Sequence, residues 1–245
     1  MSIRINPYIT VDCVVIGFDL KQLKVLLTER VFQSDLNQKP VYSDHSLPGC
    51  RIQDEEDPEE TAGRIIMELT GIPRIYLEQF MTFANPGRKK SEWDQVWLRQ
   101  MGHDPVHRMI SVAYFGLLDL NSIETGASGN KTGWFPVDDL PLLAFDHAEI
   151  IGKALESLRR RIRVSSIGYL MLPKKFSLSQ LQALYEVIYR VSLDKRNFRK
   201  KMGKMKYLIP LNEKQSNVSH KPAQLYMFSQ EVYEITKGDF FENIM

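Results

Sequence analysis

The sequence is poor in the features that mark secreted proteins, proteins stabilised by a structural metal, and membrane-bound proteins. Its 245 residues include only two cysteines, Cys13 and Cys50. They form no Cys-x-x-Cys pair, so the sequence predicts no zinc site and no disulfide framework. No apolar run approaches the roughly 20 residues of a membrane-spanning helix, and no charged N-terminal region precedes an apolar one. We therefore expect a protein of the reducing cytoplasm with no membrane role.

There is also little net charge, +2 over the whole chain, but it is unevenly distributed. Residues 1–150 contain 14 basic and 22 acidic residues, a balance of −8. Residues 151–245 contain 18 basic and 8 acidic residues, a balance of +10. A basic half is typical of a domain that meets phosphate. The contrast predicts two domains with different tasks: residues 1–150, and residues 151–245 with a linker helix at their start.

The first 150 residues mix strand and helix patterns. β-Branched and aromatic residues predict strands at 8–18, 22–31, 75–84, 109–120 and, briefly, 134–135. Helical apolar spacing between Pro58 and Leu69, followed by Gly71, predicts a helix. The polar segments 32–46 and 85–108 are interpreted as loops. The second is a long irregular insertion, and such insertions often carry function.

The remaining residues predict a connector helix and a compact helical motif. The connector spans 146–163, with Asp146 as its cap and a run of arginines at its end. Ser177 and Gln180 form a capping pattern for the next helix, and Asp194 can cap a third. Strands at 207–211 and 224–228 then flank a polar loop. The order of helix, helix and β-ribbon is that of a winged helix-turn-helix.

The segment 190–206 contains eight basic residues and one acidic residue. Arg and Lys read guanine and Asn reads adenine in the major groove, while other cations contact phosphates. The alternative is a solvated basic face, and an RNA-binding function is weaker because no aromatic-rich sheet motif is present. We expect double-stranded DNA as the partner. The expected contacts are Lys195, Arg196, Asn197, Arg199, Lys200, Lys201, Lys204, Lys214, His220 and Lys221.

A second segment resembles the Nudix box, a loop–helix–loop that holds divalent metal on clustered carboxylates to cleave diphosphates. Aligned on Glu56 and Arg64, its spacing is kept, and Glu68, Gly71 and Ile72 also match. Three positions depart: Cys50 replaces a glycine, and Ile65 and Leu69 replace metal-binding glutamates. Because Mg²⁺ needs hard oxygen ligands, the box is degenerate. We therefore expect no metal, no cofactor and no hydrolysis.

Longer stretches resemble the NrtR family of Nudix-related transcription regulators. The resemblance rests on 83–86, 111–114, 134–141 and 144–147 in the first part, and on 176–186, 193–201 and 221–228 in the second. It implies an α+β protein: an N-terminal Nudix-like α/β/α sandwich with a mixed sheet, then a C-terminal winged helix-turn-helix. It also implies a homodimeric, ligand-responsive regulator, with a repressor favoured over an activator. Within the family the chain is similar to arabinose-responsive regulators of the AraR kind.

The residues leave two effector classes open. A diphosphate such as ADP-ribose needs metal or clustered Arg and Lys to replace its hydration, whereas a sugar needs matched polar groups and an aromatic face. Because the front half is acidic and contains Trp93 and Trp97, we expect a pentose, with L-arabinose favoured. ADP-ribose or a related nucleotide is the alternative. The expected effector residues are Arg30, His45, Glu56, Arg64, Glu68, Arg88, Trp93 and Asp94.

Two further functions compete with this interpretation. A Nudix hydrolase with a basic appendage would release phosphate products in a Mg²⁺-dependent way, and Glu68 would be required. A sugar-binding module without a DNA partner would leave the basic half unexplained. His147 also suggests catalysis, but at the start of a helix such a residue is more often a packing or capping residue.

Overall fold

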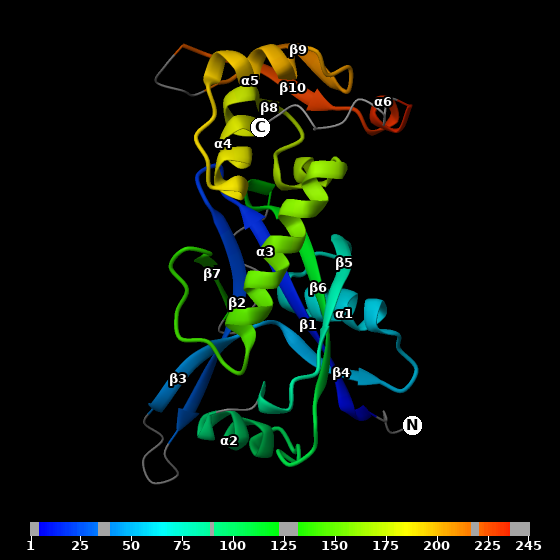
Figure 1. Cartoon of the computed structure of the whole chain (residues 1–245), viewed down its shortest axis with the longest axis vertical. Helices are drawn as coiled ribbons and strands as arrows, with labels where there is room; N and C mark the ends of the chain where they lie inside the picture. Colours follow the sequence, from blue (N-terminus) through cyan, green and yellow to red (C-terminus); the bar gives the residue numbers. More distant parts are fainter. Residues whose placement is uncertain (1–4, 34–39, 89–90, 123–131, 217–220, 236–245) are drawn as a thin grey trace. The chain divides into compact units, whose positions relative to one another are not determined.

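The computed structural model describes residues 5–33, 40–88, 91–122, 132–216 and 221–235, and Figure 1 shows its elements in sequence colours. The chain divides into two compact units. Unit 1 contains Met1–Ile16, Lys24–Leu117 and Glu124–Leu155, and unit 2 contains Gly17–Leu23, Leu118–Ile123 and Glu156–Met245. No helix in the described part of the chain is long and apolar enough to cross a membrane.

A seven-stranded sheet forms the centre of unit 1 (Figure 1). Its main path runs β3-β2-β1-β6-β5, and β4 pairs with β1 while β7 pairs with β2. The strands are β1 Ile5–Phe18, β2 Leu23–Gln33, β3 Pro40–Ser46, β4 Gly49–Gln53, β5 Tyr76–Phe83, β6 Ile110–Asp119 and β7 Thr132–Pro136. The mixed α and β composition and the strands predicted from β-branched and aromatic runs are confirmed.

Helix α1, Pro58–Thr70, packs on this sheet. Asp57 and Glu60 form a capping box at its start, and Gly71 ends it with a φ of 69°, a left-handed conformation that suits glycine. Its Ile65 and Ile66 join Val11, Val15 and the rest of one buried apolar cluster. Local capping signals and apolar spacing therefore agree on this helix, which the sequence predicts to within a residue.

Two segments predicted as loops contain regular structure. Residues 40–46 form strand β3, where Arg30↔Asp44 is one of six β2–β3 pairings. Residues 85–108 contain the 3₁₀ turn η1, Pro86–Arg88, and helix α2, Glu92–Gln100, so this insertion is not irregular throughout. Polar composition concealed both elements, although the capping box of Ser91 and Asp94 was visible in the sequence.

Helix α3, His147–Val164, begins in unit 1 and ends in unit 2. Its buried stripe is Ile150, Ile151, Ala154, Leu158 and Ile162. Near its C-terminus, Arg159 donates to the carbonyl of Ile188 at 2.7 Å, and Arg163 lies over the ring of Tyr189. The arginine run therefore includes side chains that attach the end of α3 to the next helix.

The C-terminal part of unit 2 is the predicted winged helix. The elements are η3 Ile167–Met171, β8 Phe176–Ser177, α4 Leu178–Tyr189, α5 Lys195–Met202, β9 Leu208–Lys214, β10 Gln224–Phe228 and α6 Gln230–Ile235, and η2, Leu120–Ser122, also belongs to this unit. The strands form one sheet in the order β8-β10-β9. Aromatic rings fill its core, with Tyr169 stacked on Phe228 at 4.3 Å.

Candidate functional site

A cavity of about 470 Å³ opens in unit 1. That volume lies within the roughly 300–1,000 Å³ range of small-molecule sites. Its lining includes Thr10, Asp12, Gly49, Cys50, Arg51, Gln53, Arg64, Ile65, Glu68, Leu69, Arg88, Trp97, Leu98, Met101, His103, Met109, Phe145 and His147. The lining therefore comes mainly from β1, β4, α1, α2 and the start of α3.

The pairing of β1 with β4 forms one wall of the cavity. Thr10 pairs with Arg51, and Asp12 pairs with Gly49. Because successive side chains of a strand point to opposite faces, Arg51 shares the cavity face with Gln53, whereas Ile52 belongs to the buried apolar cluster. The same alternation that builds the core thus exposes polar groups to the cavity.

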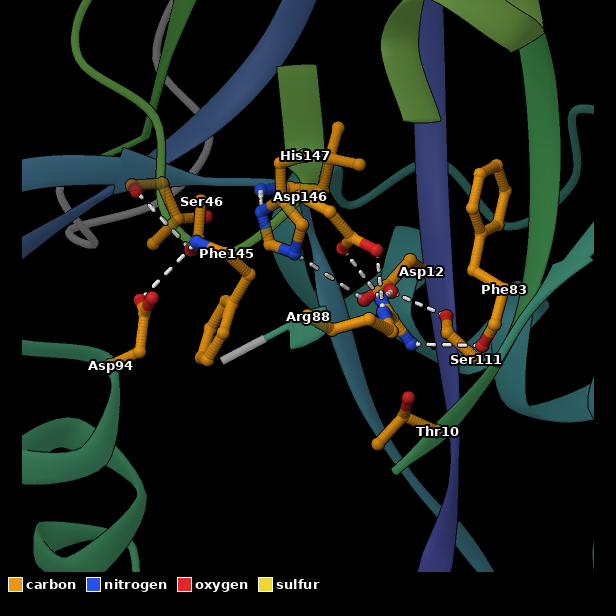
Figure 2. A network of polar contacts seen from close by, with 12 residues as sticks. Thr10, Asp12, Ser46, Phe83, Arg88, Asp94, Ser111, Phe145, Asp146 and His147 are labelled. Atoms are coloured by element: carbon orange, nitrogen blue, oxygen red, sulfur yellow. Dashed lines mark hydrogen bonds and ion pairs between the residues drawn. The ribbon is translucent and has the colours of Figure 1, made fainter. Parts of the chain in front are cut away.

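Arg88 is the centre of a buried polar network (Figure 2). It donates to Asp146 at 2.7 and 3.0 Å, to Asp12 at 3.2 Å, and to the carbonyl of Phe83 at 3.2 Å. Asp12 also accepts a hydrogen bond from the Ser111 hydroxyl. Burial opposes the charge of Arg88, but the bonds to Asp146 and Asp12 outweigh it, so its pKa is raised. The positive charge of Arg88 is therefore already matched by carboxylates.

His147 lies beside this network as a buried, uncharged ring. Its Nδ1 accepts a 2.9 Å hydrogen bond from the backbone N–H of Leu47, so the ring proton of the neutral form is on Nε2, 4.0 Å from Asp12. Burial lowers the pKa of His147. Charging the ring would place a second proton against the Leu47 N–H. His147 is thus a packing and hydrogen-bonding residue of the cavity wall, as its position at a helix start suggested.

A second buried network holds α2 beside the cavity. Arg30 is 0% exposed and binds Asp44 at 2.6 and 2.5 Å and Asp94 at 3.0 Å. Asp94 also accepts from the backbone N–H of Phe145 at 3.2 Å, and the Arg30 guanidinium lies 4.8 Å from the centre of the Phe145 ring. The network therefore joins β2, β3, α2 and Phe145, which lies two residues before α3.

The segment that resembles the Nudix box does not fit a metal. Arg64 donates to Glu56 at 2.6 and 2.8 Å, which lowers the pKa of Glu56 and occupies both of its oxygens. Ile65 is only 4% exposed and packs in the core, while the Glu68 side chain is 61% exposed. Within the described residues, no group of three or more His, Cys, Asp or Glu side chains could hold a metal ion.

The predicted effector residues separate into two sets. Arg64, Glu68 and Arg88 line the cavity. The other five, which do not line it, are Arg30, His45, Glu56, Trp93 and Asp94. They serve neighbouring packing: Trp93 stacks on Tyr42 at 4.5 Å, and His45 contacts Phe135.

Most of the lining escaped the sequence prediction, including Arg51, His103 and Phe145. Trp97, which the sequence offered as an aromatic face, does line the cavity. Strand alternation is the signal that could have found Arg51, because the residue lies between the core positions Cys50 and Ile52.

Helix α5 presents the predicted basic surface. Asp194 caps its start by accepting from the Asn197 N–H, and Phe198 and Met202 are buried. Lys195, Arg196, Asn197, Arg199, Lys200 and, beyond the helix, Lys204 are exposed, and Lys201 is half-buried. Lys214 and Lys221 are exposed at the ribbon, whereas His220 lies outside the described residues. The helix is therefore anchored on one side and cationic on the other.

Comparisons with known proteins also find two parts in the chain, an N-terminal NUDIX domain and a C-terminal winged helix domain. The NUDIX domain model matches residues 7–158, and the NrtR DNA-binding winged helix domain model matches residues 168–228. The "ADPR responsive transcriptional repressor NtrR" of Acinetobacter baylyi is 29% identical over 235 residues, which are 94% of this chain and 85% of the relative. The ADP-ribose pyrophosphatase of Methanocaldococcus jannaschii is 27% identical over 149 residues, 60% of this chain and 72% of the relative.

A solved structure extends the likeness to both units. The crystal structure of Shewanella oneidensis NrtR complexed with a 27mer DNA is 28% identical, with a TM-score of 0.70 over 92% of this chain and 95% of that chain. The NUDIX model alone covers more than half of the chain, and the winged helix model follows it directly. The chain belongs to the NUDIX family and, within it, to the transcriptional regulators of the NrtR type.

Proposed function

We propose that this regulator is a repressor that binds a DNA operator as a homodimer, and that ADP-ribose in the unit 1 cavity changes its operator affinity. The single observation that carries the DNA function is the form of α5. Phe198 and Met202 fix the helix, while Arg196 and Arg199 face solvent. A fixed helix with exposed cations and an exposed Asn197 fits the major groove.

Dimers of such motifs place one recognition helix in each of two half-sites, which supports the proposed homodimer. Two copies of α5 would contact half-sites one helical turn, or a multiple of it, apart in a pseudo-palindrome. An effector then acts by changing the spacing of the two helices, because only one spacing fits the operator. By linkage, the operator changes effector affinity by the same factor.

ADP-ribose is favoured over the pentose that the acidic composition suggested. The Acinetobacter baylyi relative is ADPR responsive, and the Methanocaldococcus jannaschii relative is an ADP-ribose pyrophosphatase. The cavity volume suits a nucleotide, and a lone pentose is much smaller. Three arginines also line the cavity, since Arg51, Arg64 and Arg88 meet there from separate segments. Trp97 and Phe145 provide aromatic surface for a base.

The route from cavity to DNA is proposed to begin at three consecutive residues. Phe145 and His147 line the cavity, Asp146 holds Arg88, and α3 starts at His147 (Figure 2). Phe145 has a φ of 50°, a left-handed conformation that costs a non-glycine residue on the order of 1–3 kcal/mol. A ligand that moves these groups acts on the first turn of a helix that continues into unit 2.

The test is a fluorescence-anisotropy titration with DNA from the gene's own upstream region, with and without ADP-ribose and with L-arabinose as the comparison ligand. We expect tight binding that weakens with salt and that ADP-ribose alone changes. A response to L-arabinose alone would replace the effector. An absence of DNA binding at low salt would overturn the regulator itself. Chromatography after incubation with Mg²⁺ and ADP-ribose should detect no AMP, and AMP release abolished by Glu68→Gln would favour the hydrolase.

A further inference from the structure

We propose that Arg51 is the anion-binding residue of the cavity and that it takes the diphosphate of a nucleotide such as ADP-ribose. This assignment rests on the proposed function, because it names the part of the effector that the side chain would hold. Arg51 belongs to none of the resemblance's matched positions. It is also a different residue from Arg64 and Arg88, which the sequence analysis selected.

Arg51 lacks an anionic partner among the described residues. Its side chain lines the cavity, yet its Nε is buried without a hydrogen-bond partner. Within the described part of the chain, no acidic side chain forms an ion pair with it. Burial lowers the pKa of Arg51, and no opposing charge or hydrogen bond offsets that effect. A partly buried cation without a partner is costly until an anion reaches it.

The other two cavity arginines, unlike Arg51, are already bound to carboxylates. Arg64 is held by both oxygens of Glu56 and contacts Glu68 at 3.4 Å. Arg88 is held by Asp146 and Asp12. To bind a diphosphate, either residue would first have to give up a carboxylate. Arg51 offers its guanidinium without that loss.

The residues that surround Arg51 in the cavity could also accommodate an anion. Gln53 and Thr10 share its cavity face, so neutral polar groups flank the cation. His103 also lines the cavity, and its pKa is lowered, first by burial and then by the positive charge of Arg51. An anion between Arg51 and His103 would satisfy both groups. The apolar lining, which includes Trp97 and Met109, is then left for the uncharged parts of the ligand.

The experiment measures ligand affinity by calorimetry for the full-length wild type, Arg51→Met, Arg51→Lys and the control Arg99→Met. Arg99 is an exposed cation on α2 that does not line the cavity. The probes are ADP-ribose, adenosine and inorganic pyrophosphate. Adenosine lacks phosphate, and pyrophosphate lacks the nucleoside, so the two separate the anion from the rest of the effector.

We expect Arg51→Met to weaken ADP-ribose and pyrophosphate at least about tenfold, the loss of one charge-assisted hydrogen bond. Adenosine affinity should stay unchanged, Arg51→Lys should retain part of the binding, and Arg99→Met should behave as wild type. The thermal midpoint of ligand-free Arg51→Met should not fall, because an unpartnered cation is removed. A lower midpoint with equal losses for all three probes would show a structural role and overturn the assignment.

The remaining outcomes separate this inference from the proposed function. Wild-type ADP-ribose affinity in Arg51→Met overturns the role of Arg51 and leaves ADP-ribose as effector. If the wild type binds pyrophosphate through Arg51 but not ADP-ribose, the effector proposal fails and the anion site stands. If pyrophosphate binds as tightly as ADP-ribose, an inorganic anion is the ligand. If the wild type binds neither phosphate compound, both proposals are wrong.

Discussion

In unit 1 two arginines beside the cavity, Arg30 and Arg88, are buried against carboxylates, whereas in unit 2 most cations of α5 face solvent. Arg30 with Asp44 and Arg88 with Asp146 stabilise local structure and hold elements together. Arg196 and Arg199 contact solvent from a helix whose opposite side is anchored by Phe198. Arginine side chains therefore stabilise the fold where they are buried, and they are available for DNA recognition where they are exposed.

The difference in burial also determines whether a substitution should change stability or DNA binding. Removing one partner of a buried pair leaves an uncompensated charge and costs about 3–5 kcal/mol of stability. Exposed side chains away from such features change stability within about ±0.5 kcal/mol. Substitutions in the buried pairs of unit 1 should therefore affect folding, and those of the exposed cations on α5 should affect DNA binding alone.

Arg30→Met should have the largest effect. It leaves Asp44 and Asp94 buried without their shared cation, so the free energy of unfolding should fall by about 3–5 kcal/mol. Chemical denaturation followed by circular dichroism measures it, with the exposed Arg99→Met as the control. A loss below about 1 kcal/mol would mean that the network is not what stabilises this part of unit 1.

The double variant Arg196→Ala with Arg199→Ala should have the second largest effect. Its operator affinity should fall at least about 100-fold. Its free energy of unfolding should change by less than about 0.5 kcal/mol. Anisotropy and denaturation measure the two quantities. The control is Arg74→Ala with Arg99→Ala, an equal charge change at two exposed positions of unit 1. Unchanged gel shifts of the α5 variant would show that another element recognises DNA.

Asp146→Asn should have an intermediate effect: because Arg88 keeps Asp12 as a partner, stability should fall less than in Arg30→Met, and the informative change is in the coupling between effector and operator. The substitution weakens the hold on Arg88 one residue before α3. The coupling free energy between ADP-ribose and the operator should therefore fall by about 0.5–2 kcal/mol. ADP-ribose would then change operator affinity by a smaller factor than in the wild type. Titrations with and without ligand measure it, with the exposed Asp139→Asn as the control. An unchanged factor would remove the Phe145–His147 segment from the proposed route.

His147→Asn should have the smallest effect, visible only as a pH dependence. Burial lowers the pKa of His147 below its ordinary 6.5. Below pH 6.5 the unfolded chain binds a proton that the folded protein does not. Stability attributable to this group is therefore complete above pH 6.5 and decreases as the pH falls toward the folded pKa, by at most about 1.4 kcal/mol per pH unit.

Asparagine keeps an oxygen that can accept from the Leu47 N–H but does not titrate. The thermal midpoint of His147→Asn should therefore change less than that of the wild type between pH 7.5 and 5.5. The control His107→Asn alters an exposed histidine and should follow the wild type. Identical pH profiles for wild type and His147→Asn would contradict the assignment of the buried neutral ring.

The sequence predicted the winged helix more completely than the cavity. Capping residues Ser177 and Asp194 and the apolar spacing that includes Phe198 and Met202 are local signals, and the helices begin where these signals put them. The cavity depends on pairs such as Arg88 with Asp12, 76 positions apart, and Leu47 with His147, 100 apart. No local pattern encodes such distances, so Arg30 and Asp94 were assigned to a ligand although they bind each other.

The amino-acid sequence by itself determined the charge division, the boundaries of α1, and the cationic face of α5, because periodicity and capping act within a few residues. Only the tertiary structure decided which charges are neutralised. Strand pairing and burial turned Arg30 and Arg88 into structural cations and left Arg51 without a partner at the cavity wall. The physical reason is that a charge is matched by whatever the fold places within a few ångströms of it.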